Sequence, residues 1–177
     1  KKDRSIVFNA SLFQRKEENA FAYETVDFTT YAGQFRNVGE NKVKGFDLGL
    51  KYKLNEMFNF GGNFSYVEKE KEETMLRQPK QRINSFVEVL PFKSTRVNLS
   101  HQYVSKRMDS FYNSATFSVD NVELESFNLF ALNINQKISS NLDAYFNVGN
   151  LFNTSYVDVI GYTTKPRNYT VGVNYQF

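Results

Sequence analysis

The sequence predicts an all-β protein that forms a transmembrane antiparallel β-barrel. Three features support this prediction: a side-chain alternation with a period of two, the absence of helix-period patterns, and alternating short and long connections. A period of two is the strand period, so each alternating segment has one apolar face and one polar face. Residues 167–177 show it most clearly, because aromatic or β-branched residues fill every second position and small polar residues stand between them.

The composition narrows the class of protein. Of 177 residues, 41% are hydrophobic and 16% aromatic, while the mean hydropathy is −0.52. No apolar run has the length of a membrane-spanning helix, but barrel strands give no such run because they alternate. The 22 basic and 19 acidic residues leave a net charge of only +3, which argues against a nucleic-acid partner. With no cysteine, a disulfide framework and a thiolate metal site are both excluded.

Eight segments show the strand alternation over about nine to eleven residues, the length that a tilted strand needs to cross a bilayer. The fourth is the least regular, since Phe86 and Leu90 fall on its polar face. In chain order, the apolar positions are Ile6, Phe8, Ala10 and Leu12; Phe46, Leu48, Leu50, Tyr52 and Leu54; Phe58, Phe60, Phe64 and Tyr66; Ile83, Val87 and Val89; Val97, Leu99, His101 and Tyr103; Phe130, Leu132, Ile134 and Ile138; Leu142, Ala144, Phe146 and Val148; and Tyr169, Val171, Val173, Tyr175 and Phe177.

The connections between these segments alternate in length. Short turns are predicted near 55–56, 91–94 and 139–141, and long loops over 14–30, 68–81, 105–123 and 153–167. Outer-membrane barrels have short periplasmic turns and longer extracellular loops. A soluble sheet has no reason to keep all its long loops at one end, so the connections favour a barrel in the outer membrane.

The polar face has the composition of a barrel lumen. Asn, Gly and Ser recur on it although they are poor strand formers, and small side chains leave room for the contents of a lumen. Asp47 and Glu88 lie on this face, where water can hydrate them, whereas a lipid-facing carboxylate is costly.

The chain resembles TonB-dependent outer-membrane receptors in the order and spacing of several motifs. The end of the family's barrel is matched by the segment NVGNLFN at 147–153, followed by Tyr156, Gly161-Tyr162, Pro166-Arg167 and the strand to Phe177. Upstream, Asn37-Val38-Gly39 and then Lys44-Gly45-Phe46-Asp47-Leu48 look like another strand of the family. Residues 102–104 with Arg107 and Tyr112 are similar to the smaller receptors, the cobalamin and siderophore group.

This resemblance implies a 22-stranded barrel with a plugged lumen, of which residues 1–177 form about the last eight strands. We therefore expect the chain to be the C-terminal portion of one barrel domain, with the plug and the earlier strands absent from it. The lack of a signal peptide before the first strand also suggests a processed or incomplete chain.

The function implied by the resemblance is energised uptake of a scarce nutrient across the bacterial outer membrane. The expected partners are membrane lipid and lipopolysaccharide, the TonB complex acting through the missing plug, and the barrel-assembly machinery. A surface lipoprotein partner is left open, as is the ligand: cobalamin, an iron chelate, an oligosaccharide or a peptide. No cofactor and no enzymatic activity are expected.

Function is expected in the long loops, where aromatic side chains stack on flat surfaces and arginine pairs with anions. The alternative is that the aromatics form the interfacial girdle and the cations meet lipopolysaccharide or solvent. The ligand-contacting candidates are Arg107, Phe111, Tyr112, Tyr156, Tyr162 and Arg167.

The last strand resembles the recognition signal read by the barrel-assembly machinery, and its candidate positions are Tyr169, Val171, Gly172, Val173, Tyr175 and Phe177. No catalytic or metal site is predicted, because no nucleophile–base pair and no calcium-loop spacing is present. The single histidine, His101, falls on the lipid-facing register.

Two other interpretations are left open. A self-contained eight-stranded outer-membrane barrel could serve as an adhesin, a structural protein or an enzyme, since eight strands can close into a small barrel. A soluble ligand-binding barrel would be extracted without detergent.

Overall fold

The computed structural model describes residues 4–26, 29–30, 32–70 and 76–177, and its regular elements are all β-strands. Among these residues, no helix has the length and apolarity to cross a membrane. The main sheet contains β1 (Ser5–Thr25), β2 (Gly33–Lys53), β3 (Phe58–Lys69), β4 (Gln81–Phe92), β5 (Thr95–Val104), β8 (Phe127–Lys137), β9 (Leu142–Gly149) and β10 (Asn168–Tyr175). A separate hairpin contains β6 (Arg107–Asn113) and β7 (Ser118–Leu124).

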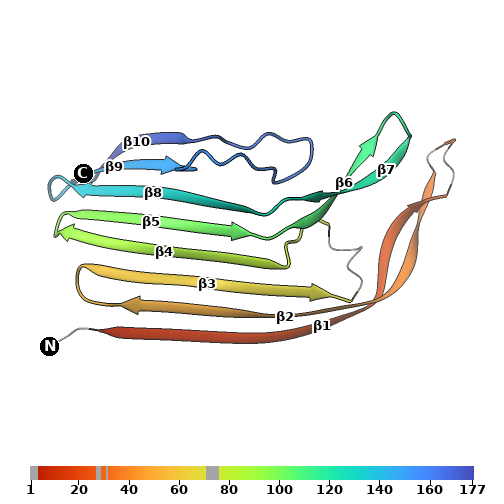
Figure 1. Cartoon of the computed structure of the whole chain (residues 1–177), viewed down its shortest axis with the longest axis horizontal. Helices are drawn as coiled ribbons and strands as arrows, with labels where there is room; N and C mark the ends of the chain where they lie inside the picture. The colour runs from red at the N-terminus through yellow and green to blue at the C-terminus, as the bar shows by residue number, and fades with distance from the viewer. Residues whose placement is uncertain (1–3, 27–28, 31, 71–75) are drawn as a thin grey trace.

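The eight strands of the main sheet lie in the order β1-β2-β3-β4-β5-β8-β9-β10, and every neighbouring pair is antiparallel (Figure 1). The all-β antiparallel prediction and its eight strands are thus confirmed. The sheet does not close on itself, because β1 and β10 are its two edges.

The register places the predicted apolar positions side by side on one face. Phe8 pairs with Leu50, and Leu99 pairs with Leu132. Large apolar side chains on this face are open to the surroundings, and Leu12 is 86% exposed. Such an extended apolar surface is what a membrane-spanning wall presents to lipid.

Phe86, one of the two irregular residues of the fourth predicted strand, has a structural explanation. It lies on the polar face opposite Gly61, and a Cβ atom added to Gly61 would approach the Phe86 ring to 2.5 Å. The missing side chain at Gly61 therefore makes room for the ring.

The three predicted short turns lie together at one end of the sheet, at the left of Figure 1. In the first, Asn55 Oδ1 accepts hydrogen bonds from the amides of Met57 and Phe58, both at 2.8 Å. In the second, Pro91 still belongs to β4, so this turn is tighter than predicted. The third joins β8 to β9.

The prediction of an irregular loop over 14–30 is wrong. β1 continues to Thr25, and β2 already begins at Gly33, so the two strands form a long hairpin arm that extends beyond the rest of the sheet (Figure 1). The stretch around Arg15–Glu18 is polar on both faces, so it lacks the apolar period of two that marks a lipid-facing strand. The loop predicted over 105–123 likewise contains the hairpin of β6 and β7.

The few buried apolar side chains in the described part gather mainly at the loop end of the sheet. Val104, Leu124 and Phe127 are all at most 6% exposed, and they lie where β5, β7 and β8 meet. The packed core is therefore a junction between the sheet and its long loops.

Candidate functional site

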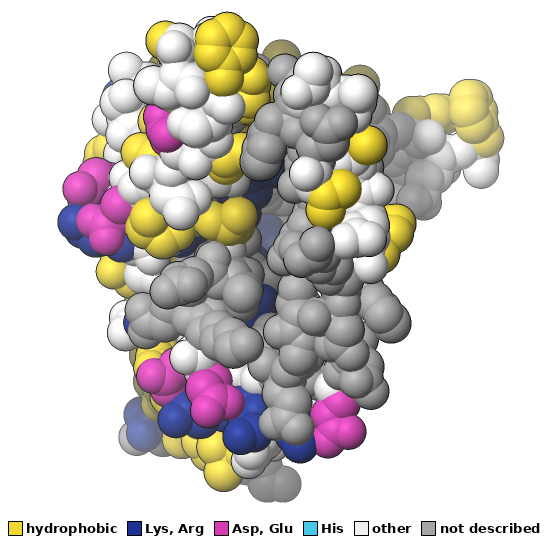
Figure 2. Space-filling view, turned by 90° about the vertical axis from the view of Figure 1, so that its right-hand side faces the viewer, with side chains coloured by type: hydrophobic (Ala, Val, Ile, Leu, Met, Phe, Trp, Pro, Cys, Tyr) yellow, Lys and Arg dark blue, Asp and Glu magenta, His cyan; other side chains and the backbone are white. Residues whose placement is uncertain are grey.

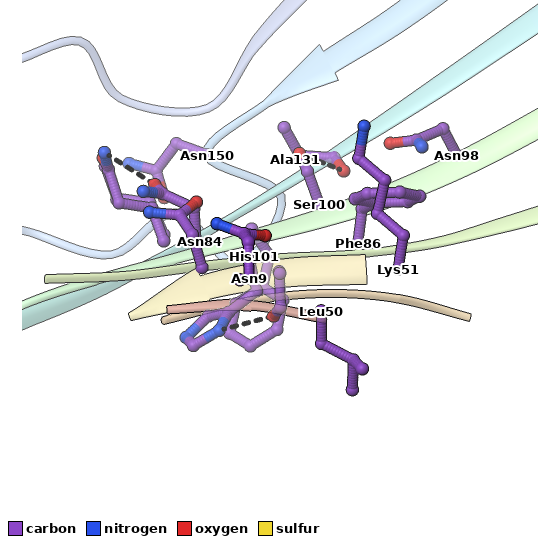
Figure 3. Close-up of a pocket in the computed structure, with 17 residues that line it drawn as sticks. Asn9, Leu50, Lys51, Asn84, Phe86, Asn98, Ser100, His101, Ala131 and Asn150 are labelled. Atoms are coloured by element: carbon purple, nitrogen blue, oxygen red, sulfur yellow. Dashed lines mark hydrogen bonds between the residues drawn. The ribbon is translucent and has the colours of Figure 1, made fainter. Parts of the chain in front are cut away.

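The polar face of the sheet forms a hollow of about 730 Å³. Figure 3 shows Lys51, Phe86 and Asn98 on one side of the ribbons and Leu50 pointing away on the other. About half of the lining residues have an amide or hydroxyl side chain, among them Asn9, Asn63, Asn84, Asn98, Ser100 and Gln102. This wall offers many neutral hydrogen-bonding groups.

Charged groups on the wall are held by neighbours across the strands. Glu88 accepts a hydrogen bond from Asn59 Nδ2 at 2.9 Å, and its Oε2 lies 3.3 Å from Arg96 Nε. Glu88 therefore lies on the polar face, as its predicted register requires.

At the loop end, a buried carboxylate joins three segments of the chain. Asp109 in β6 is 0% exposed, and it accepts hydrogen bonds from Arg77 Nε at 2.6 Å and from the amides of Ser110 at 2.7 Å and Ile160 at 2.9 Å. The residues before β4, the β6–β7 hairpin and the β9–β10 connection thus meet at one side chain. We call the assembly around Asp109 and Arg107 the loop junction.

The pKa of Asp109 reflects this arrangement. Burial raises the pKa of the carboxyl, but the hydrogen bonds from the Ile160 amide, the Arg77 guanidinium and the Ser110 amide outweigh it. The pKa therefore lies below its ordinary value, and the group is ionised at neutral pH.

Arg107 is the second charged group of the junction. Its side chain is 2% exposed, and Nη2 donates to the carbonyl oxygens of Val157 at 3.0 Å and Asp158 at 2.8 Å and to Asp158 Oδ1 at 2.9 Å. The guanidinium also lies over the Phe127 ring, 5.3 Å from its centroid. Nη1 is buried without a hydrogen-bond partner in the described part of the chain.

Two of the six predicted ligand contacts meet at Phe127. Arg107 lies over one part of this ring, and Tyr156 packs against it with 4.6 Å between ring centroids. Both residues are thereby built into the loop junction, and their contact with a ligand stays a prediction.

The other four candidates lie at the surface of the loop end. Phe111 and Tyr112 in β6 are 39% and 54% exposed, and Tyr162 is 75% exposed. Arg167 is also exposed, and its amide donates to Asn153 Oδ1 at 2.9 Å. They lie on two different segments, β6 and the β9–β10 connection.

The predicted assembly positions follow β10 on the apolar face, with Gly172 as the exception. Tyr169, Val171 and Val173 are 63%, 79% and 66% exposed. Gly172 lies on the polar face opposite Tyr145, and a Cβ atom there would come within 2.4 Å of the Tyr145 hydroxyl oxygen. Its lack of a side chain accommodates that tyrosine.

His101 lies on the lipid-facing register, as predicted. Its ring nitrogens lie 3.3 Å from Ser85 Oγ and 2.8 Å from Asn128 Oδ1, and the ring stacks on Phe130 with 4.6 Å between centroids. Within the described ranges, no group of three or more His, Asp or Glu side chains is arranged to hold a metal ion.

Sequence reasoning missed Asp109, Arg77 and Phe127 as the centre of the junction. Arg77 and Asp109 are 32 residues apart, and the contact between Asp109 and Ile160 spans 51 residues. No local pattern connects such positions. The only local signal was that Asp109 and Asp158 are acidic residues within long loops.

Known proteins similar to this chain are transporters and receptors. The vitamin B12 transporter BtuB of Vibrio cholerae is 21% identical over 154 residues, which cover 86% of this chain and 25% of that protein. The pyoverdine outer membrane receptor FpvA of Pseudomonas aeruginosa matches with a TM-score of 0.76 and 17% identity, over 97% of this chain and 27% of that one. The ferric-catecholate import receptor Fiu of E. coli matches with a TM-score of 0.73 and 18% identity, over 97% of this chain and 24% of that one.

The chain therefore spans about a quarter of the length of these relatives. Its residues 1–151 match the family model for the TonB dependent receptor-like β-barrel. Together with the antiparallel sheet and its lipid-facing register, this match shows that the chain belongs to the TonB-dependent receptor β-barrel family of bacterial outer-membrane proteins.

Proposed function

We propose that this chain is the C-terminal part of the barrel of a receptor that takes up a scarce nutrient, either an iron chelate or cobalamin. The observation that most supports this proposal is the open eight-stranded sheet, which leaves strand edges at β1 and β10 for the rest of a larger barrel. Unpaired edges are costly in lipid, because no water satisfies their backbone groups. A 22-stranded barrel would supply the missing neighbours.

The two faces and the loop end suit different tasks in such a receptor. The apolar face contacts membrane lipid, and the amide-lined hollow faces a plug domain through which the TonB complex acts. The loops contact the ligand and lipopolysaccharide. The chain supplies wall and loops, with no enzymatic step.

The six candidate residues divide into two groups in this proposal. Phe111, Tyr112, Tyr162 and Arg167 are exposed at the loop end and meet the ligand directly. Arg107 and Tyr156 lie inside the loop junction, so their effect on the ligand comes through the position of the loops.

The test is uptake by cells that carry the complete receptor. Radiolabelled cobalamin and a radiolabelled iron chelate are offered to cells with and without the receptor, and with and without a working TonB complex. We expect uptake of one nutrient to require both components. Uptake that persists after removal of either one contradicts the proposal.

The self-contained barrel remains the second candidate, but the structure gives it little support. An eight-stranded barrel closes only when its two edge strands, β1 and β10, pair with each other. In the described sheet they are not paired and lie apart at opposite edges (Figure 1).

We also propose that β10 is the signal read by the barrel-assembly machinery. Replacement Phe177→Ala should lower the amount of assembled receptor severalfold, because it removes an apolar anchor that packs on Tyr175 at 5.1 Å between centroids. Ligand affinity of the assembled fraction should stay unchanged. The matched control is the adjacent Gln176→Ala, and normal membrane levels of the Phe177 variant would reject the idea.

A further inference from the structure

A second, smaller hollow of about 270 Å³ lies at the loop end of the polar face. Its position follows from the register, because Arg82 pairs with Ser65 in β3 and with Val104 at the end of β5. Its lining consists of Ser65, Val67, Arg77, Gln78, Pro79 and Arg82. We call it the arginine pocket. Figure 2 looks onto the loop end, where Lys and Arg side chains are visible among the described residues.

The loop junction holds Arg77 in a defined position. Its Nε donates to the buried Asp109 carboxylate at 2.6 Å, and its amide donates to the Met108 carbonyl at 2.7 Å. The backbone of Arg77 has a φ of 61°, a left-handed conformation that residues other than glycine adopt only when the surroundings impose it. The fold therefore maintains a strained residue at this position.

The outer edge of the Arg77 guanidinium is available for a ligand. Its side chain is 55% exposed, and only Nε is used by the carboxylate. Within the described residues, the two Nη groups make no hydrogen bond. Guanidinium donors in this planar arrangement match a pair of oxygen atoms on an anion.

Arg82 contributes a second cation, and it has no ion pair with any residue that the structure describes. Other cations of the sheet and its loops are paired: Lys106 at the loop end contacts Glu123 at 3.0 Å, and Arg96 at the short-turn end lies 3.3 Å from Glu88. Asp109 pairs with Arg77 alone, and no described carboxylate pairs with Arg82. Among the described residues, the lining of the pocket therefore holds two arginines and no carboxylate.

We propose that Arg77 and Arg82 form a binding site for an anionic arm of the transported ligand, with carboxylate or catecholate oxygens. This proposal rests on the proposed uptake function and makes it more specific, because it selects anionic iron chelates over neutral chelates and cobalamin. The pocket is smaller than a site for a whole drug-sized ligand, which needs roughly 300–1,000 Å³. It therefore takes one arm of a larger chelate, and Ser65 and Gln78 supply neutral hydrogen bonds beside the two cations.

The same oxygen chemistry has a second source, a carboxylate elsewhere on the complete receptor. An internal carboxylate would neutralise the arginines in the absence of any ligand. Replacement of the arginines would then leave this carboxylate without its partners and lower the thermal stability of the empty receptor. At a ligand site, replacement of Arg82 would lower the affinity for the ligand and leave the empty receptor stable.

The experiment uses the complete receptor, purified in detergent, and isothermal titration with three probes. The probes are a trianionic ferric tris-catecholate, a neutral ferric tris-hydroxamate and cyanocobalamin. The variants are Arg82→Gln alone, Arg77→Gln combined with Arg82→Gln, and Arg96→Gln as a control that removes a cation from the same face beside Glu88.

We expect the unaltered receptor to prefer the tris-catecholate and the double variant to bind it about tenfold more weakly or worse, since each lost charge-assisted hydrogen bond alone can account for a tenfold change. Affinity for the tris-catecholate should also fall with added salt, and less so in the double variant. The Arg96→Gln control should keep the affinity within about twofold, because Arg96 does not line the arginine pocket. When empty, Arg82→Gln alone and the Arg96→Gln control should melt at the temperature of the unaltered receptor, whereas the double variant should melt lower because Arg77 also pairs with the buried Asp109.

Three results overturn the proposal. Preference for the hydroxamate or cyanocobalamin, with equal affinity in receptor and double variant, rejects the anion site and leaves the uptake function standing. A lower melting temperature of the empty Arg82→Gln variant, without loss of tris-catecholate affinity in the double variant, assigns Arg82 to an internal carboxylate and rejects the anion site. Absence of binding to all three probes rejects the anion site together with the proposed uptake of these nutrients.

Discussion

The sheet wall and the loop junction are stabilised in different ways. In the wall, each strand between β1 and β10 pairs with two neighbours along its length, and apolar side chains repeat on one face. In the junction, two buried charged side chains, Asp109 and Arg107, connect three segments through the backbone of Ser110, Asp158 and Ile160 and the side chain of Arg77. The wall therefore distributes its stability over many equivalent positions, whereas the junction depends on a few.

This comparison predicts that single substitutions act most strongly at the junction. Asp109→Ala leaves Arg77 unpaired and removes the acceptor from two amides, so we expect the junction to be destabilised by about 3–5 kcal/mol. Hydrogen exchange of the Ile160 amide in the complete receptor measures the loss.

The matched control for this change is Asp120→Ala in the same hairpin. Asp120 accepts from Asn113 Nδ2 at 2.7 Å and from Ser118 Oγ at 3.1 Å, so its contacts stay within the β6–β7 hairpin. Equal protection of Ile160 in both variants would contradict the central role of Asp109.

In the wall, the face of a residue should decide the cost of a charge. Leu99→Arg places a guanidinium on the lipid-facing side of β5 and should cost about 2–4 kcal/mol near the bilayer midplane. The neighbouring Ser100→Arg points to the polar face and should cost far less. Denaturant unfolding from lipid vesicles measures both, and equal costs would mean that the register is misassigned.

A smaller effect is expected from the glycine beneath Phe86. Gly61→Ala introduces a methyl group that meets the Phe86 ring, and overpacking of this kind costs about 1–3 kcal/mol. The cost should fall in a Phe86→Ala background, where the ring is absent. A double-mutant cycle from vesicle unfolding tests this coupling, and strictly additive effects would show that the two residues do not interact.

The smallest effect is the response of the junction to pH near neutrality. The pKa of Asp109 is lowered in the folded protein, so its contribution is complete above the ordinary Asp pKa of about 3.9 and is lost as the pH falls through the folded value. Protection of the Ile160 amide, corrected for intrinsic exchange, should be constant from about pH 8 to pH 5 and decrease only in stronger acid. Asp109→Asn should remove this acid response, and a loss that begins near pH 6 would point to another titrating group.

The same contrast explains how much of the molecule the sequence predicts. The wall is predictable because lipid and lumen impose opposite chemistry on alternate residues, as Val171 and Thr170 illustrate. The hairpin arm of β1 and β2 is not predictable in this way, because the apolar alternation of the sequence is lost near Arg15.

The candidate site is predictable only in part. Long loops indicate where ligands bind, and Arg107 was selected from them, yet its burial over Phe127 depends on the β9–β10 connection about fifty residues away in the chain. Arg77 shows the limit most clearly. Its position depends on a left-handed backbone and on Asp109, and neither has a signature in the sequence around it.

The central claim is that this open sheet is one part of a larger barrel. The most direct test is the intact mass of the native polypeptide, recovered from the outer membrane and measured by mass spectrometry. We predict a mass several times the 20.6 kDa of these 177 residues, since the related receptors are about four times as long. A mass near 20.6 kDa would contradict the account and favour a self-contained eight-stranded barrel.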